Sequence, residues 1–273
     1  MATATAEKLD DTIEASFNYM VHKGPRPVTT WDKPSLGYPH KDRTYETHTA
    51  VVRNGRNHPQ LSVEHHGFAL RPQRTKMTDF FDEDEIRAVY YPEMEALIKE
   101  STGAYRVLIF DHTLRSGYEE KGAKAPVQNV HNDYTEWSGP ERVRDLLPDE
   151  ADDLFKRRFA VVQVWRGMLN PVLRDPLAMC DAQSIATEDL IPTVRPHPNR
   201  LGETYHLTYS PDHRFYYFPE MQPDEAIVFK CYDSKTDGRA RFSAHSAFEH
   251  PDTPEDAPPR ESIEIRTLAF FDD

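Results

Sequence analysis

The sequence predicts a mainly β protein with flanking helices, either a β-sandwich or a jelly roll. Helical periodicity comes first, with apolar residues at three- and four-residue steps between Glu85 and Ser101. After residue 158 the chain turns to short aromatic or β-branched runs that are separated by turn dipeptides. A chain of 273 residues can bury one sizeable core, but strand spacing alone leaves other barrels open.

The helices have recognisable boundaries. Asp82 followed by Glu85 resembles a capping box at the start of the first helix, and Gly103 is expected to end that helix. A second helix is expected over residues 140–147. A third is expected over 148–156, where acidic residues suit the positive end of a helix.

The expected strands are short runs that suit a pleated, half-buried surface. They cover residues 106–110, 159–165, 204–209, 214–218, 225–232 and 262–271. Residues 1–12 are small and polar, and we expect them to be disordered. We interpret 1–62 as an arm, partly extended, that packs on the core and is a candidate lid over the site, and 63–273 as the β domain.

Composition narrows the class of protein. The chain has 33 basic and 46 acidic residues, a formal charge of −13, which argues against nucleic acid or an anionic membrane surface as partner. Residues 1–15 lack the apolar stretch of a signal peptide, and no apolar run approaches a membrane span. With two cysteines, Cys180 and Cys231, we expect no disulfide framework and a cytoplasmic location. A homodimer is compatible with the sequence.

The triplet His131-Asn132-Asp133 is the strongest indication of chemistry. In a β-strand, residues i and i+2 project to the same face, so His131 and Asp133 can reach one metal ion while Asn132 points away. Two imidazoles and one carboxylate favour non-haem Fe(II) and leave positions open for a cosubstrate and O2. A His-x-Asp also arises by chance in a chain with 13 histidines, and it is then structural.

A second imidazole must come from elsewhere in the chain. His245 is the preferred candidate, although a histidine among small residues can simply be a hydrogen-bonded core group. His206, His213 and His250 compete with it. Spacing favours His245 only in combination with the residues that follow.

Those residues are Arg260 and Ser262, at the start of the last expected strand. On one strand face, a guanidinium and a hydroxyl can together bind a carboxylate through charge-assisted hydrogen bonds. A dicarboxylate such as 2-oxoglutarate needs such an anchor at its far end while its keto-acid end chelates iron. Arg266 has the same strand parity and is a reserve candidate, although an ion-paired role suits it better.

Several segments together resemble a known family. They are Tyr90–Glu93, Phe110–Arg115, His131–Asp133, Arg158–Arg166, Lys230–Phe242, His245–Phe248 and Pro258–Arg266. From about residue 65 to the C-terminus, the chain resembles the AsaB/CmcJ-type oxidoreductases. This group is abundant in fungal secondary metabolism and includes the novofumigatonin endoperoxide-forming enzyme.

The resemblance implies a double-stranded β-helix, a cupin-like jelly roll, that uses ferrous iron and 2-oxoglutarate. It implies that His131, Asp133 and His245 are the iron ligands, and that Arg260 and Ser262 bind the distal carboxylate of 2-oxoglutarate. Where many members continue with Gln-Ser or Gln-Thr, this chain has Tyr134 and Thr135, so substrate identity does not carry over.

Two further features admit two interpretations each. Arg166, at the end of a strand, can bind the cosubstrate or a substrate carboxylate, or it can form an ion pair with Asp111 or another core acid. Asp111-His112 can be a catalytic dyad, but a buried structural hydrogen bond is the better interpretation.

The sequence therefore predicts an Fe(II)/2-oxoglutarate-dependent dioxygenase that oxidises a C–H bond of a small molecule and releases succinate and CO2. The outcome can be hydroxylation, desaturation, ring closure or peroxide formation. One alternative is a cupin-like iron dioxygenase that does not use 2-oxoglutarate, which the Arg260/Ser262 pair disfavours. Another is a β-sandwich binding protein with structural histidines.

Overall fold

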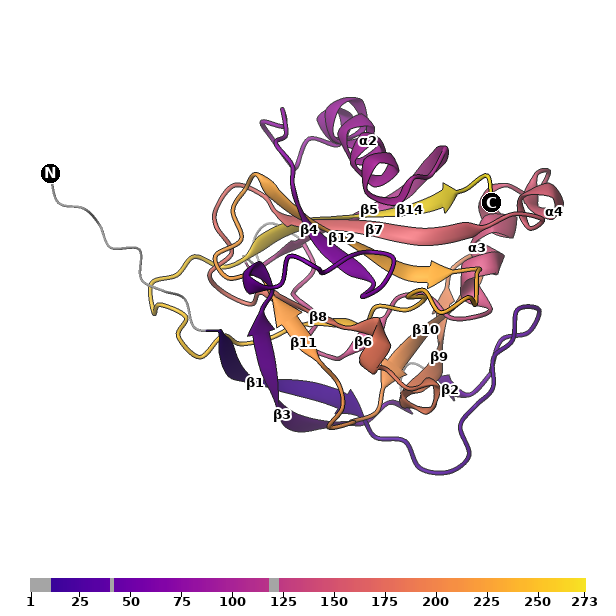
Figure 1. Ribbon diagram of the computed structural model, residues 1–273, viewed down its shortest axis with the longest axis horizontal. Coiled ribbons are helices and arrows are strands. Elements are labelled where there is room, and N and C mark those ends of the chain that lie inside the picture. Colours follow the sequence, from indigo (N-terminus) through magenta and orange to yellow (C-terminus); the bar gives the residue numbers. More distant parts are fainter. Residues whose placement is uncertain (1–10, 40–41, 118–122) are drawn as a thin grey trace, which may run out of the picture.

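The computed structural model describes residues 11–39, 42–117 and 123–273. Two β-sheets face one another, and α2 covers the outer face of the smaller sheet (Figure 1). The expected disorder of residues 1–12 falls mostly outside the described ranges, except that β1 begins at Thr12. This arrangement, mainly β with few helices, is the jelly roll that the sequence predicts.

The larger sheet has nine strands in the order β1-β3-β11-β8-β13-β6-β10-β9-β2. Its neighbours are antiparallel except for the pairs β11/β3 and β2/β9. The strands are β1 (Thr12–Met20), β2 (Tyr38–Pro39), β3 (Tyr45–Asn54), β6 (His131–Asn132), β8 (Leu177–Cys180), β9 (Leu190–His197), β10 (Arg200–Leu207), β11 (Phe215–Tyr217) and β13 (His245–Ala247).

The smaller sheet is fully antiparallel, in the order β4-β12-β7-β14-β5. Its strands are β4 (Phe68–Pro72), β5 (Arg106–Ser116), β7 (Phe159–Gly167), β12 (Glu225–Asp233) and β14 (Glu261–Phe270). The central strand β7 is buried at every position. One of its faces packs against the helices and the other against the larger sheet.

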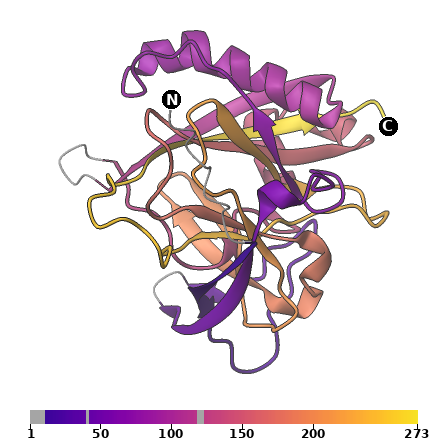
Figure 2. The same ribbon diagram turned by 60° about the vertical axis from the view of Figure 1, so that its left-hand side comes forward.

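The helices are short apart from one continuous stretch over the smaller sheet, which Figure 2 shows from the side. They are α1 (Glu83–Glu85), the π-helical η3 (Ile86–Tyr90), α2 (Tyr91–Thr102), α3 (Ser138–Leu146), α4 (Ala151–Leu154) and the 3-10 turns η2 (Gly55–Asn57), η5 (Ala182–Ser184) and η6 (Thr187–Asp189). Tyr90, Met94 and Ile98 pack on Val162 and Val164 of β7.

The boundaries of the first helix are largely as predicted. Asp82 accepts hydrogen bonds from the backbone N–H groups of Asp84 and Glu85, and Gly103 ends α2 in the left-handed conformation at φ 78°. The reciprocal half of the capping box is absent among the described contacts, because the Glu85 carboxylate accepts from Thr78 and Asp79 instead. The third predicted helix shrinks to the four residues of α4.

Residues 45–54, part of the region that we interpret as a partly extended arm, belong to the larger sheet. They form β3, which pairs with β1 along its full length and with β11 on its other side. The strand was not expected because one face carries exposed polar side chains and the apolar signal is weak. Residues 22–37 do run along the surface, where Ser35 binds Glu203 and Trp31 packs on Phe155. The domain division at residue 62 stays a prediction.

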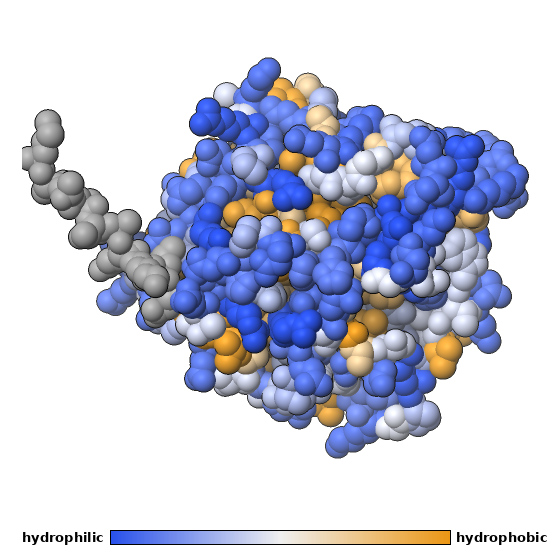
Figure 3. Space-filling model, viewed as in Figure 1, coloured by the Kyte–Doolittle hydropathy of each residue, from blue (hydrophilic) through white to orange (hydrophobic). Residues whose placement is uncertain are grey.

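The face of the molecule in Figure 3 is mostly hydrophilic, with small separate hydrophobic patches. Within the described ranges, no helix is both long and apolar enough to cross a membrane.

Candidate metal centre

Three of the predicted residues meet where β6 and β13 pair. His131 lies directly opposite His245 in this antiparallel pair, and Asp133 follows two residues after His131. One ligand atom from each of the three side chains lies within 4.8 Å of the others. His131 Nε2 is 3.6 Å from Asp133 Oδ1. Asp133 itself lies just beyond β6, which ends at Asn132, so the turn after the strand rather than strand alternation brings its carboxylate to the two imidazoles.

Both imidazoles are held in the tautomer that a metal ligand needs. His131 Nδ1 donates to the backbone carbonyl of Asn129 at 2.7 Å, and His245 Nδ1 donates to that of Ser243 at 3.1 Å. A carbonyl can only accept, so Nδ1 carries the proton and Nε2 keeps its lone pair. Burial, reinforced by the neighbouring His245, lowers the pKa of His131 to about 3, which keeps the ring neutral.

Asp133 is held as a carboxylate by its neighbours. Its Oδ2 accepts from Gln163 Nε2 at 3.0 Å and from Arg266 Nε at 3.3 Å. Burial raises the pKa of the Asp133 carboxyl, but Arg266 and the two imidazoles outweigh burial and hold this pKa below its usual range. Oδ1 is left on the side of His131, where a ligand atom is needed.

Asn132, between the two ligands, ties the site to the rest of the fold. Its amide donates to the carbonyls of Tyr134 at 2.6 Å and Cys231 at 2.8 Å, and its oxygen accepts from the Ser243 N–H at 3.1 Å. The side chain is fully buried. It therefore joins the His131 strand to β12 and to the segment that carries His245.

A small cavity opens beside the two histidines and contains the predicted anchor arginine. Its lining residues are Arg115, Val127, His131, Trp165, Leu177, His245, Ala247, Arg260 and Glu264. Arg260 is buried against Trp165 and donates from Nη1 to the carbonyl of Asp175, while its Nε has no partner among the described residues. Burial lowers the pKa of Arg260 to about 10, so the group stays charged at neutral pH.

Ser262 lies on the same face of β14 as Arg260, although it does not itself line this cavity. Its hydroxyl is buried and, within the described part of the chain, also lacks a partner. Buried polar groups are normally satisfied, so a free guanidinium nitrogen and a free hydroxyl on one strand face suit an anionic ligand. The donor set fits ferrous iron and a carboxylate cosubstrate.

The other predicted residues lie elsewhere. Arg166 is on the opposite face of β7 from Gln163 and Trp165, where its guanidinium contacts Gln73 and lies near the Phe80 ring. The structure does not bring Arg166 to the histidines, and no acid pairs with it in the described ranges. Sequence reasoning could not assign its face because β7 is buried on both sides.

The competing histidines are also accounted for. His206 lies opposite His131 on β10 but contacts Arg43 and Tyr45. His213 bonds to Asp189, and His250 bonds to Tyr217. None belongs to the three-residue group found among the described residues.

Asp111 and His112 do not form a dyad. Asp111 is 3.1 Å from Arg266, while His112 bonds to the Tyr91 hydroxyl. Arg266 thus bridges Asp111, Asp133 and Glu264, which is the ion-paired role that the sequence favoured for it. Sequence reasoning missed its contact with Asp133, because the acids come from three different strands or loops.

A larger cavity adjoins the other side of the site. It has a volume of about 270 Å³ and contains Asp133 in its wall. Its lining residues are Phe110, Asp111, His112, Thr113, Arg115, Lys124, Asp133, Tyr134, Ser138, Arg195, His197, Arg200, Gly202, Glu203, Thr204 and Arg266. Arg115 lines both cavities.

Several known proteins are similar to this chain in sequence and in fold. The family described as "Oxidoreductase/YMDC permease-like domain" matches residues 17–270. The hydroxylase/desaturase efuI of Hormonema carpetanum is 34% identical over 84% of this chain and 85% of its own. The Fe(II)/2-oxoglutarate-dependent dioxygenase nvfI of Aspergillus novofumigatus is 35% identical over 85% of this chain and 84% of its own.

Solved structures agree with these relatives. A structure titled iron and alpha-ketoglutarate-dependent endoperoxidase NvfI has a TM-score of 0.79 and 29% identity, covering 95% of this chain and 98% of that one. A second structure of NvfI, in a different conformation, has a TM-score of 0.83 and 28% identity, covering 97% and 99%. The chain belongs to this family of fungal Fe(II)/2-oxoglutarate-dependent oxidoreductases.

Proposed function

We propose that this chain is an Fe(II)/2-oxoglutarate-dependent dioxygenase in which His131, Asp133 and His245 hold the iron. Arg260 and Ser262 bind the distal carboxylate of 2-oxoglutarate. The substrate is a small molecule, of the natural-product or amino-acid type, that is oxidised at a C–H bond. Fe(II) bound there would oxidise that C–H bond with O2, and 2-oxoglutarate would be converted to succinate and CO2.

The protein's own residues fix the metal position and tune its ligands. Hydrogen bonds from Nδ1 of each imidazole orient Nε2 toward the shared centre, and Gln163 with Arg266 orients the Asp133 carboxylate. Three protein ligands leave coordination positions for cosubstrate and oxygen. Burial of the ligands limits the access of water to the reacting atoms.

One observation supports a site for 2-oxoglutarate in addition to a metal site. A buried guanidinium nitrogen of Arg260 and a buried hydroxyl of Ser262 lack partners, and Arg260 lines the same cavity as both histidines. An arginine so placed is costly for an empty pocket but suits a carboxylate that enters beside the metal. A cupin-like dioxygenase that binds only its substrate has no use for this anchor, and a binding protein has no use for the triad.

Anaerobic titration of the metal-free protein tests the function. Adding Fe(II) and then 2-oxoglutarate should produce a weak visible charge-transfer band that needs both additions. Iron binding without a response to 2-oxoglutarate would favour the cupin-like alternative, and the absence of iron binding would favour the β-sandwich binding protein. A parallel titration with Arg260→Ala tests whether the response depends on the anchor.

The remaining proposals concern the setting of the enzyme. We infer from the acidic charge that it acts without nucleic acid or membrane. From the two cysteines we infer a cytoplasmic location, and a homodimer is the oligomer to test. Analytical ultracentrifugation checks the last of these. We also infer that residues 1–62 contribute a lid, which limited proteolysis with and without cosubstrate would check.

A further inference from the structure

The larger cavity beside Asp133 carries a charge opposite to that of the chain. Five of its lining residues are Lys or Arg and three are Asp or Glu, whereas in the whole chain acids exceed bases by 13. Local excess of one sign in a concave site attracts ligands of the other sign. The wall of this cavity therefore has an excess of basic residues, whereas the chain as a whole has an excess of acidic ones.

The acids of this cavity are already engaged. Asp111 and Asp133 both lie within ion-pair distance of Arg266. Glu203 accepts hydrogen bonds from the Ser35 N–H and hydroxyl at 2.7 and 2.6 Å, and from the Thr135 hydroxyl at 2.7 Å. They leave little acceptor capacity for other cations in the wall.

Four cations of the wall take part in no ion pair with an acid among the described residues. They are Arg115, Lys124, Arg195 and Arg200. Arg115 donates to the carbonyl of Ala125, which is neutral. Burial and then Arg142 lower the pKa of Arg200, and burial followed by Arg200 and Arg195 lowers that of His197. Around Arg200, burial and the neighbouring Arg142 thus outweigh the nearby acids Asp145 and Asp111.

The β9–β10 hairpin presents two of these cations side by side. Arg195 pairs with Gly202 and His197 with Arg200, and residues directly opposite in an antiparallel pair share a face. Gly202 permits the close approach of β9 there, because a Cβ would lie 3.0 Å from the Arg195 carbonyl oxygen and 3.1 Å from His197 Nε2. The two guanidinium groups therefore border one cavity, whose wall also includes the metal ligand Asp133.

We propose that the substrate carries an oxoanion group, a carboxylate or a phosphate ester, which Arg195 and Arg200 bind in this cavity. The inference rests on the proposed function, since it names the substrate class of the same site. Phe110 and Tyr134 supply apolar surface for the carbon skeleton. The cavity volume of about 270 Å³ lies just below the usual range of small-molecule sites, roughly 300–1,000 Å³, and so suits a compact acid.

Matched aromatic probes test this inference on the anaerobic enzyme loaded with Fe(II) and saturating 2-oxoglutarate. Calorimetric titration compares 2-naphthoate and 2-naphthyl phosphate with the neutral methyl 2-naphthoate. At least one anion should bind about tenfold or more tightly than the ester, with a preference that shrinks at high salt. The stronger of the two anions then identifies the oxoanion.

The double variant Arg195→Gln/Arg200→Gln should lose this preference while the charge-transfer band of the iron–cosubstrate complex stays unchanged. Arg74→Gln is the matched control, because its side chain is 92% exposed and does not line the cavity. Persistence of the band during probe titration shows that the anion does not displace 2-oxoglutarate from Arg260.

Three results would overturn the inference: equal affinity for acid and ester, no binding of either anion at millimolar concentration, or an anion preference that survives in the double variant. Each is distinguishable from failure of the proposed function. In that case the charge-transfer band itself would be missing before any probe is added.

Discussion

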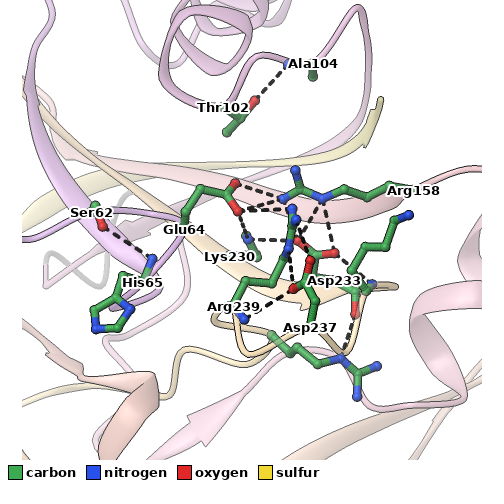
Figure 4. A network of polar contacts seen from close by, with 12 residues as sticks. Ser62, Glu64, His65, Thr102, Ala104, Arg158, Lys230, Asp233, Asp237 and Arg239 are labelled. Carbon is green, nitrogen blue, oxygen red and sulfur yellow. Dashed lines mark hydrogen bonds and ion pairs between the residues drawn. The ribbon is translucent and has the colours of Figure 1, made fainter. Parts of the chain in front are cut away.

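Two charged regions of this molecule differ in whether their polar groups all have partners. In the ion network of Glu64, Arg158, Lys230, Asp233 and Arg239, every carboxylate is shared by two or more cations (Figure 4). At the metal centre, the buried Arg260 and Ser262 keep donors without partners in the described structure. The first region is complete without a ligand, and the second is not.

The closed network is made possible by an irregularity in β12. Residues three apart on a regular strand face opposite sides, yet Lys230 Nζ lies 2.8 Å from Asp233 Oδ2. The register shift between Lys230 and Tyr232 inserts an extra residue and turns both side chains to one face. The bulge in β12 thus lets Lys230 and Asp233 pair. At the candidate metal centre, by contrast, Arg260 and Ser262 keep donors without partners among the described residues.

The comparison predicts its largest effect at the triad. Changing His131, Asp133 or His245 to Ala should abolish stoichiometric Fe(II) binding, because two ligands do not hold the ion. Anaerobic calorimetry measures the binding, and circular dichroism checks that the fold persists. His250→Ala, a histidine outside the group, should bind iron normally. Full iron binding by any triad variant would show that the ligands are wrongly assigned.

The closed network should respond in stability rather than in ligand binding. Lys230→Met removes a fully buried cation between Asp233 and Glu64, and we expect a loss of about 3–5 kcal/mol in the free energy of unfolding. Urea denaturation measures it. Lys156→Met, at an exposed ion pair, should leave the urea midpoint unchanged. If Lys230→Met were as stable as the wild type, the proposed difference between the ion network and the candidate metal centre would be wrong.

Arg260→Ala should have the reverse profile. We expect 2-oxoglutarate affinity to fall by about 2–5 kcal/mol, because the carboxylate loses a buried charge-assisted partner. Stability should fall less than in Lys230→Met, because Arg260→Ala loses packing on Trp165 and a hydrogen bond to the Asp175 carbonyl but leaves no paired carboxylate without its cation. Titration of the charge-transfer band gives the first quantity and thermal unfolding the second. An unchanged cosubstrate requirement would move the anchor to Arg115, which lines the same cavity.

The smallest effect is expected at Gln163. Gln163→Leu removes the hydrogen bond that orients Asp133 Oδ2 and should weaken Fe(II) binding about 10–100-fold. Gln163→Glu brings a second carboxylate beside Asp133 and should not restore the wild-type affinity. Anaerobic calorimetry on both variants measures Fe(II) affinity and shows whether the hydrogen bond from Gln163 or only the size of its side chain matters. Equal affinity of wild type and Gln163→Leu would remove Gln163 from the account.

The features that could be predicted from the sequence are those that depend on local periodicity. Strand alternation led us to expect His131 and Asp133 on one side, and Gly103 ends α2 in the left-handed conformation, as expected. The jelly roll and the pairing with His245 came from the resemblance as well as from the residues, since strand spacing does not specify which strands meet.

What escaped prediction depends on contacts between distant strands. In β7 both faces are buried, so hydrophobicity could not show that Gln163 faces Asp133 and Arg166 faces the helices. Arg266 reaches Asp133 only because β14 passes the end of β6, which no local pattern encodes. Strand β3 was missed because its outer face is polar and one of its pairing partners, β11, is distant in the sequence.

An anaerobic crystal structure with Fe(II) and 2-oxoglutarate tests the central claim most directly. We expect iron bound by Nε2 of His131, Nε2 of His245 and Oδ1 of Asp133, with the distal carboxylate of 2-oxoglutarate on Arg260 and the Ser262 hydroxyl. Iron bound at other residues, or a cosubstrate whose distal carboxylate lies away from Arg260, would contradict the account.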